Sequence, residues 1–173
     1  MPAGTLAVVA YDPRWPGAFA AEATRIRAAL GEIARRVDHN GSTSVPGLAA
    51  KPVIDVMVGV TTLEASRPAI AVMTDAGYAY FPYRAEVMHW FCKPSPAFRT
   101  HHVHLVPYGS RLWRERLAFR DHLRRDSAAA AAYAQLKYRL AKQYEFDREA
   151  YTDAKEPFVR AILRVALPSG EAP

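Results

Sequence analysis

Hydrophobic positions follow two different rhythms along the chain, and the change between them divides it. Up to about residue 107, short runs with a period of two alternate with helical stretches, whereas the remainder has only the 3.6-residue period of helices. We therefore expect an α+β protein with a core over residues 1–108 and a helical extension packed on that core over residues 109–167. Residues 168–173 are expected to form a frayed tail.

The same periodicity places the individual elements. The strands are expected at residues 6–10, 33–39, 53–60, 87–93 and 99–106, with a turn at residues 94–96. The helices are expected at residues 13–30, 66–76, 111–125, 127–144 and 148–166. Asp12, Ser110 and Asp126 stand just before three of these helices, where their side-chain oxygens are suited to cap the first backbone N–H groups.

Composition narrows the class of protein. The 173 residues are 50% hydrophobic and 23% charged, which is typical of a globular domain with its own core. The single cysteine, Cys92, excludes an internal disulfide framework and a cysteine-cluster zinc site. No apolar stretch reaches the roughly 18 residues that span a bilayer, and the first residues lack a signal-peptide pattern. We therefore expect a cytoplasmic protein with no membrane partner.

The net charge suits an anionic partner, and the absence of nucleic-acid-binding motifs argues against a polymer. The formal charge is +6, which suits an anionic ligand. The chain has no stripe of arginine and lysine with interleaved aromatics and no zinc-finger spacing, so no nucleic acid polymer is expected. The expected partner is a small molecule or nucleotide, and the sequence leaves the oligomeric state open.

Asp55 is the first candidate for a functional residue. It lies in the middle of the strand expected at residues 53–60, whose opposite face is aliphatic. The residues of that aliphatic face are Ile54, Val56, Val58 and Val60. A carboxylate in such a strand is costly to bury, so it requires a cation, a hydrogen-bond donor or a cleft. The alternative is a purely structural pair with Lys51 or an arginine.

Two histidines share one face of the strand expected at residues 99–106. His102 and His104 are separated by one residue, so their imidazoles point the same way. If this strand is a neighbour of the strand that carries Asp55, the three side chains form a candidate site for Mg²⁺, Mn²⁺ or Zn²⁺. In that site Asp55 and His104 are the candidate catalytic residues. Asp55 is expected to bind the metal, and His102 and His104 are expected to complete the metal site or to act in proton transfer. Hydrogen-bonded core histidines are the structural alternative.

A loop rich in glycine and hydroxyl groups follows the strand expected at residues 33–39. Gly41, Ser42, Thr43 and Ser44 offer backbone amides and hydroxyl donors that suit phosphate oxygens. The loop is not a Walker A motif, because no Gly-Lys-Ser/Thr follows at the required spacing. Its alternative interpretation is a tight connection between two elements.

Several segments together carry a family resemblance. Residues 38–56 read Asp-His-Asn-Gly-Ser-Thr-Ser-Val-Pro-Gly-Leu-Ala-Ala-Lys-Pro-Val-Ile-Asp-Val, and residues 119–124 read Phe-Arg-Asp-His-Leu-Arg. The pairs Tyr133 with Lys137 and Tyr151 with Lys155 follow in order. Over residues 6–167 the chain resembles the GrpB-like family, which looks like a distant branch of the polymerase-beta-type nucleotidyltransferase superfamily.

The resemblance implies a fold and also exposes a departure. The implied fold is a nucleotidyltransferase-like mixed sheet with flanking helices, followed by a C-terminal three-helix segment. The superfamily motif is Gly-Ser, a spacer of about a dozen residues, and Asp-x-Asp/Glu on a strand; here twelve residues separate Ser42 from Asp55. Met57 stands where the second acid is expected, and a thioether does not replace the oxygen ligand that Mg²⁺ requires. The standard two-metal site is therefore incomplete.

The resemblance further implies ligand-binding residues outside the strands. These are Lys51, Arg120, Tyr133, Lys137, Tyr151 and Lys155, whose charge suits phosphate or carboxylate. The alternative for the helical ones is an ordinary solvated helix surface with local charge pairs.

Three functions remain open on the sequence. The first is metal-dependent transfer of a nucleotidyl group from a nucleoside triphosphate to a small-molecule or protein acceptor. The second is a nucleotide- or ligand-binding regulatory module that has lost catalysis, which Met57 favours. The third is a histidine/carboxylate metalloenzyme of unrelated chemistry.

Overall fold

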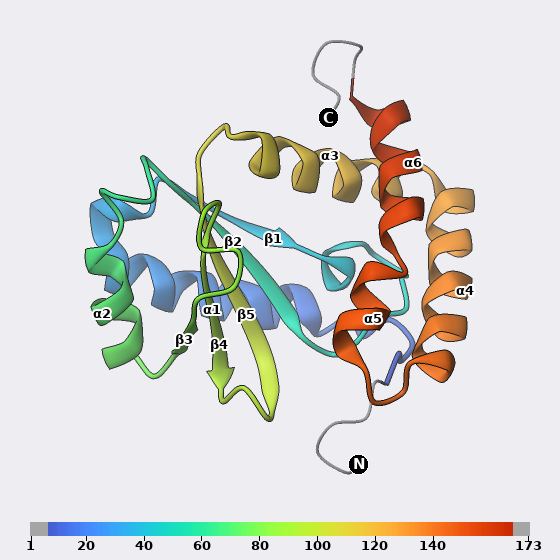
Figure 1. Cartoon of the computed structure of the whole chain (residues 1–173), viewed down its shortest axis with the longest axis horizontal. Helices are drawn as coiled ribbons and strands as arrows, with labels where there is room; N and C mark the ends of the chain where they lie inside the picture. Colours follow the sequence, from blue (N-terminus) through green and yellow to red (C-terminus); the bar gives the residue numbers. More distant parts are fainter. Residues whose placement is uncertain (1–6, 168–173) are drawn as a thin grey trace.

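The molecule, described here from a computed structural model over residues 7–167, is built on one five-stranded sheet (Figure 1). The strands are β1 (Arg36–Asn40), β2 (Ile54–Val60), β3 (Ala79–Phe81), β4 (His89–Pro94) and β5 (Arg99–Pro107). Their order across the sheet is β1-β2-β5-β4-β3. The tail expected after residue 167 lies outside the described residues, as does Leu6.

The pairing of β2 with β5 positions the candidate site. These two central strands are parallel, whereas all other neighbours in the sheet are antiparallel, so the expected mixed α+β sheet is confirmed. In the β2–β5 register Asp55 stands opposite His102 and Met57 opposite His104. The strand adjacency on which the sequence argument for a shared site depends is therefore present.

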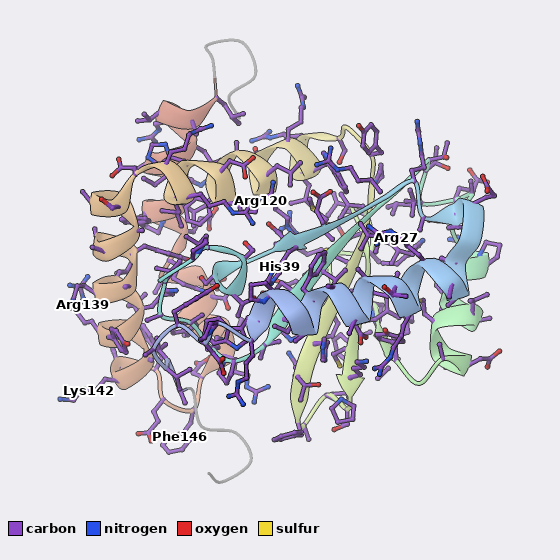
Figure 2. The ribbon with its side chains drawn as sticks, turned by 180° about the vertical axis from the view of Figure 1, so that it is seen from behind. Arg27, His39, Arg120, Arg139, Lys142 and Phe146 are labelled. Carbon is purple, nitrogen blue, oxygen red and sulfur yellow. The ribbon has the colours of Figure 1, made fainter. Side chains whose placement is uncertain are left out.

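Helices cover both faces of the sheet. Helix α1 (Trp15–Leu30) crosses one face, as Figure 2 shows from behind, and α2 (Pro68–Asp75) packs beside it. Beyond β5 the chain continues as α3 (Arg111–Arg125), α4 (Ser127–Gln143), α5 (Arg148–Asp153) and α6 (Glu156–Ala166). Two short 3-10 turns, Gly31–Ile33 and Ser42–Ser44, complete the described elements. Among the described residues no helix is long and apolar enough to cross a membrane.

The alternation along β2 divides the core into two parts. Its aliphatic face packs under α1 and α2 in the larger cluster, as the sequence predicts. The opposite face places Met57 in a second cluster with Trp90 of β4 and Trp113 of α3. Asp55 lies on this second face, one pleat before Met57, so the sheet presents its carboxylate towards the layer of C-terminal helices.

Most predicted elements are present, and three predictions are wrong in detail. The strand expected at residues 6–10 is only an isolated bridge between Val9 and Ala50 in its described part. The short edge strand β3 was not predicted, because three residues carry too little periodicity. The last expected helix is two, so four helices follow the sheet and not three; Pro157 cannot continue a helix from α5, since its ring clashes with the carbonyl of the residue four positions earlier. Ser110 and Asp126 cap α3 and α4 as expected, accepting hydrogen bonds from Trp113 and Ala129.

Candidate metal and anion site

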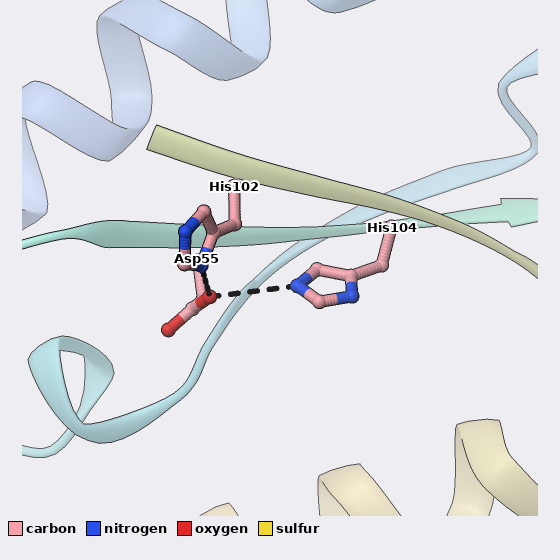
Figure 3. A group of neighbouring side chains, drawn as sticks. All are labelled: Asp55, His102 and His104. Atoms are coloured by element: carbon pink, nitrogen blue, oxygen red, sulfur yellow. Dashed lines mark hydrogen bonds and ion pairs between the residues drawn. The ribbon is translucent and has the colours of Figure 1, made fainter. Parts of the chain in front are cut away.

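Asp55, His102 and His104 converge on one point of the sheet (Figure 3). His102 Nδ1 lies 3.1 Å and His104 Nε2 lies 3.4 Å from the same oxygen, Asp55 Oδ1. The side chain of Asp55 is 28% exposed, and those of His102 and His104 are 22% and 11% exposed. The three residues therefore form a half-buried group that solvent and ligands can reach.

Burial and hydrogen bonding set the protonation of this group. Burial opposes the charge of Asp55, but hydrogen bonds from His102 and His104 outweigh it and hold the pKa of the carboxyl well below its usual range. Burial, with help from the positive charge of Arg116, lowers the pKa of His104 to about 4. At neutral pH the group is thus a carboxylate beside a neutral imidazole, the forms in which both residues bind metal ions.

The donor set fits one divalent ion of the first transition row. The three ligand atoms lie within 4.8 Å of one another. Two ligands on one Zn²⁺ at about 2.1 Å each stand about 3.0–3.4 Å apart, which is the separation of each imidazole nitrogen from Asp55 Oδ1. Two nitrogens and one carboxylate favour Zn²⁺ or Mn²⁺ over Mg²⁺, which prefers oxygen ligands throughout. Asp55, His102 and His104 would hold such an ion and leave further positions open.

The far nitrogens of both imidazoles lack partners. His102 Nε2 and His104 Nδ1 are buried, and no described residue hydrogen bonds with them. When the near nitrogens bind a metal, these far nitrogens carry the ring protons, and metal-binding histidines normally donate them to an acceptor. Without that support a metal affinity about 10–100-fold below that of a fully supported site is expected.

Met57 closes off the position where a second acid would stand. Its side chain is fully buried and packs with Met88, Trp90 and Trp113. The absence of the second carboxylate is therefore built into the packing of this face, and one candidate metal position remains.

Gly41 brings the glycine-rich loop against the carboxylate. Its φ of 67° is in the left-handed region, and a Cβ atom built there would lie 2.9 Å from Asp55 Cγ and closer still to Oδ2. Only glycine allows this approach. The Gly-Ser motif and the strand aspartate, which the sequence separates by twelve residues, are thus in contact.

The other loop residues have two different roles: one lines the cavity, and the others form hydrogen bonds that hold the loop in place. Ser42 lines the cavity beside the site, as does Tyr133. Thr43 is buried and faces away, with its hydroxyl 3.0 Å from His39 Nε2. Ser44 is also buried, and its hydroxyl donates to the carbonyl of Gly41 at 2.6 Å. Of the four predicted loop residues, Gly41 and Ser42 reach the site, whereas Thr43 and Ser44 brace the loop.

Three lysines gather around two tyrosine rings. The Nζ atoms of Lys51 and Lys155 lie 4.2 and 4.3 Å from the centre of the same ring, that of Tyr151. Lys137 is almost fully buried; its ammonium donates to the carbonyl of Ala49 and lies 4.8 Å from the ring of Tyr133. Within the described part of the chain none of the three lysines has a salt bridge to a carboxylate. We call Lys51, Lys137 and Lys155 the lysine cluster.

The lysine cluster has lowered pKa values, and a bound anion would raise them again. Burial and the mutual repulsion of the ammonium groups lower the pKa of Lys51 to about 7 and that of Lys137 to about 7. Burial also lowers the pKa of Lys155 to about 8, against an opposing attraction by the Asp55 carboxylate. An anion placed among the three ammonium groups would restore their charge, because opposite charge favours the protonated form.

Arg120 lies in the cavity wall but is already paired. Its guanidinium donates to Asp121 at 2.7 Å and to the carbonyl of His39 at 3.0 Å, and it forms an ion pair with Asp38 at 3.5 Å. These contacts tie α3 to the end of β1, just before Gly41. The predicted role of Arg120 as a ligand-binding residue is untested, and its visible contacts are those of a residue that positions the loop.

A cavity of about 840 Å³ opens beside these groups. Its wall includes Gly41, Ser42, Tyr133 and Lys155 from the candidate site, which brings the loop and the helical extension to one space. It also includes Arg116 of α3, one helical turn before Arg120, which the sequence reasoning missed. Extending the four-residue spacing of Arg120 and Arg124 backwards by one step would have found it.

The chain matches one protein family and is similar in sequence to proteins of other bacteria. The sequence model of a family described as GrpB protein matches residues 5–165. A UPF0157 protein of Pseudomonas aeruginosa is 39% identical over 170 residues, which are 96% of this chain and 69% of that protein. A UPF0157 protein of Deinococcus radiodurans is 39% identical over 163 residues, covering 94% and 83% of the two chains.

The chain is also similar to a solved structure and to part of a longer protein. The crystal structure of conserved protein GrpB from Enterococcus faecalis superposes with a TM-score of 0.84 at 34% identity, covering 92% of this chain and 96% of that one. A dephospho-CoA kinase of Mycolicibacterium paratuberculosis is 30% identical over 184 residues, which are 92% of this chain and 45% of the kinase. The described fold is therefore also that of the Enterococcus faecalis protein.

Proposed function

The chain belongs to the GrpB family, and we propose that it is a metal-dependent nucleotidyltransferase-like enzyme with a single metal position. In this proposal Asp55, His102 and His104 hold the metal, the lysine cluster and Ser42 bind the phosphates of a nucleoside triphosphate, and the cavity receives an acceptor. The bound ion supplies charge stabilisation to the phosphates during transfer.

One observation carries the proposal. Asp55 is at once the shared partner of the two histidines, the group that packs on Gly41, and the carboxylate that acts electrostatically on Lys51 and Lys155. A metal position and a cationic phosphate position therefore stand side by side. A metal–triphosphate complex carries both matching features, because its phosphate oxygens are anionic and also bind the ion.

The proposed transfer needs no reagent other than the nucleoside triphosphate and the acceptor. The acceptor's oxygen or nitrogen forms a bond to the α-phosphorus, the bond from that phosphorus to the β-phosphate oxygen breaks, and pyrophosphate leaves with the electron pair. The acceptor's proton passes to solvent. Lys137 and Lys155 neutralise the charge on the leaving phosphates, and Ser42 donates a hydrogen bond to them.

The two histidines lack hydrogen-bond acceptors for their far nitrogens among the described residues, and this favours a metal that binds as a complex with the nucleotide. Because no described group accepts a proton from His102 Nε2 or His104 Nδ1, the protein alone should bind metal weakly. Phosphate oxygens of the nucleotide would fill the open positions. Metal and nucleotide should therefore bind together far better than either does alone.

Relatives named dephospho-CoA kinase support a nucleotide-related role and not a kinase reaction. This chain spans under half the length of the Mycolicibacterium protein, and the name describes the whole of it. This chain also lacks the Gly-Lys-Ser/Thr of a Walker A motif, so phosphate transfer of the P-loop type is not part of the proposal.

A second candidate is a binding module without catalysis. The observation that favours it is the sealed position of Met57, which leaves the metal site one carboxylate short of the superfamily pattern. Both candidates predict nucleotide binding, so they differ only in whether pyrophosphate is formed.

The experiment is a thermal-shift matrix of four nucleoside triphosphates with Mg²⁺, Mn²⁺ and Zn²⁺, on wild type and Asp55→Asn. A ligand that binds the native state raises the melting temperature by mass action. We expect a shift that requires nucleotide and metal together and disappears in Asp55→Asn. No shift with any pair would overturn both candidates. Where a shift is found, pyrophosphate release with a mixture of small acceptors supports the enzyme, and its absence supports the binding module.

A further inference from the structure

Arg116 differs from Arg111, Arg120 and Arg160, three other arginines of the cavity wall. Arg111 pairs with Glu115 at 2.7 Å, Arg160 with Glu156 at 2.6 Å, and Arg120 with the acids named above. Arg116 Nη1 is buried, and no described residue accepts a hydrogen bond from it. Its Nη2 donates to the thioether of Met88 at 3.7 Å, a weak acceptor.

A buried guanidinium without an acid is costly unless a ligand satisfies it. Burial and the positive charge of Arg84 lower the pKa of Arg116 to about 10, against an attraction by Asp55. Among the described residues no hydrogen bond or ion pair joins Arg116 to Asp55, which pairs with the two histidines instead. The donors of a guanidinium match a carboxylate or phosphate in pairs, so an anionic ligand group would complete this residue.

The surroundings of Arg116 define what the anion is attached to. Arg84 also lines the cavity and has no carboxylate partner among the described residues. Next to these two arginines the wall is apolar, formed by Val87, Leu112 and Phe119. An apolar wall contributes affinity in proportion to the apolar ligand area that it buries.

We propose that Arg116, assisted by Arg84, binds the anionic group of an amphipathic acid whose apolar body packs on Val87, Leu112 and Phe119. The anionic group is a carboxylate or a phosphate, which offer the same paired oxygens to the guanidinium. This subsite lies on α3, whereas the lysine cluster comes from the loop before β2 (Lys51), from α4 (Lys137) and from the connection between α5 and α6 (Lys155). Its identification with the acceptor of the transfer rests on the proposed function; the binding itself does not.

The test is a calorimetric titration with three probes of matched size. 3-Phenylpropionate and phenyl phosphate each carry an anion on an apolar body, and 3-phenylpropan-1-ol is the neutral control. We expect at least one anion to bind about tenfold or more tightly than the alcohol, since a hydrogen bond to a charged group has about that effect. The comparison of the two anions decides between carboxylate and phosphate. Equal binding of all three probes, or of none, would overturn the proposal.

Variants locate the anion. Arg116→Gln should lose about tenfold in affinity for the preferred anion, whereas Arg160→Gln, a cavity arginine that already has an acid, should bind as wild type does. Unchanged binding in Arg116→Gln contradicts the proposal. Arg116→Met should melt no lower than wild type, because it removes an unpaired buried charge; a clear drop in its melting temperature would indicate a structural role instead.

A parallel titration separates this inference from the proposed function. Inorganic tripolyphosphate should bind the lysine cluster, so its affinity should fall in Lys137→Gln and remain in Arg116→Gln. The phenyl anion should show the reverse pattern. If tripolyphosphate fails to bind while the phenyl anion binds through Arg116, the proposed function is wrong and the acid subsite stands.

Discussion

The carboxylate of Asp55 packs directly on the backbone of Gly41, where a Cβ atom would lie 2.9 Å from Asp55 Cγ. The contact joins Gly41, at the start of the loop after β1, to Asp55 near the start of β2, so that two distant parts of the sequence motif lie against each other. Gly41 meets two demands there, because its φ of 67° is also unfavourable for any residue with a side chain.

We predict that Gly41→Ala lowers the free energy of unfolding by more than the backbone strain alone would. Gly47 is the matched control, since its φ of 78° is equally left-handed but a Cβ atom there meets nothing within 4 Å. Gly47→Ala should lower the free energy of unfolding by about 1–2 kcal/mol, the backbone cost alone. Gly41→Ala should lower it further and also displace Asp55. Urea denaturation of both variants checks this, and an equal cost for the two would show that the contact with Asp55 is unimportant.

Position 57 should not accept the acid that polymerase-beta-type nucleotidyltransferases have at the second position of their Asp-x-Asp/Glu motif. Met57 is enclosed by Met88 and Trp113, so a carboxylate in its place would be buried among apolar side chains. We expect Met57→Asp to lose several kcal/mol of stability, on the order of 3–5, and to gain no Mg²⁺-dependent activity, whereas Met57→Leu should cost less than about 1.5 kcal/mol. A stable, folded Met57→Asp protein that binds Mg²⁺ would contradict this description of the site.

The sequence predicts the fold better than it predicts which polar groups face the ligand. The alternation in β2 and β5 identifies both the aliphatic core face and the shared face of Asp55, His102 and His104, because strand geometry fixes the side of each residue. It does not distinguish Ser42, which lines the cavity, from Thr43, which turns inward to His39. That difference depends on the backbone path of the loop.

The helical residues illustrate the same limit. Arg120 and Arg116 lie one turn apart on α3, and nothing local in the sequence says which one has acids waiting on another element. The partner of Arg120 at long range is Asp38 of β1, 82 positions earlier in the chain. Pairings of this kind follow from tertiary packing and not from periodicity.

The lowered pKa of Lys137 should make the protein more stable at high pH. Its pKa is about 7 in the folded protein and near 10.5 when unfolded. Between these values the unfolded chain binds more protons, so the free energy of unfolding rises as pH increases from 7 to about 10. Lys137→Met should flatten this rise. Urea titrations of both proteins at pH 7 and 9.5 check the sign, and an identical slope in the variant would refute the assignment to Lys137.

Anion binding at the lysine cluster should take up protons. An anion restores the ammonium charge of Lys51, Lys137 and Lys155, whose pKa values are about 7, 7 and 8. Tripolyphosphate should therefore bind more tightly at pH 6 than at pH 9, and calorimetry at pH 8 in buffers of different ionisation enthalpy should register proton uptake. Lys142→Gln, an exposed lysine of α4, is the control that should change nothing. Affinity that is independent of pH would contradict this account of the cluster.

The central claim is that Asp55, His102 and His104 hold one divalent metal beside a phosphate position, and direct metal titration tests it. Calorimetry with Mn²⁺ or Zn²⁺, with and without ATP, would be run on wild type, on Asp55→Asn, and on Asp75→Asn as an exposed control. We expect one ion per chain in wild type and Asp75→Asn, bound much more tightly with ATP, and loss of this binding in Asp55→Asn. Wild type that binds no ion in the presence of ATP, or Asp55→Asn that binds it equally well, would contradict the account.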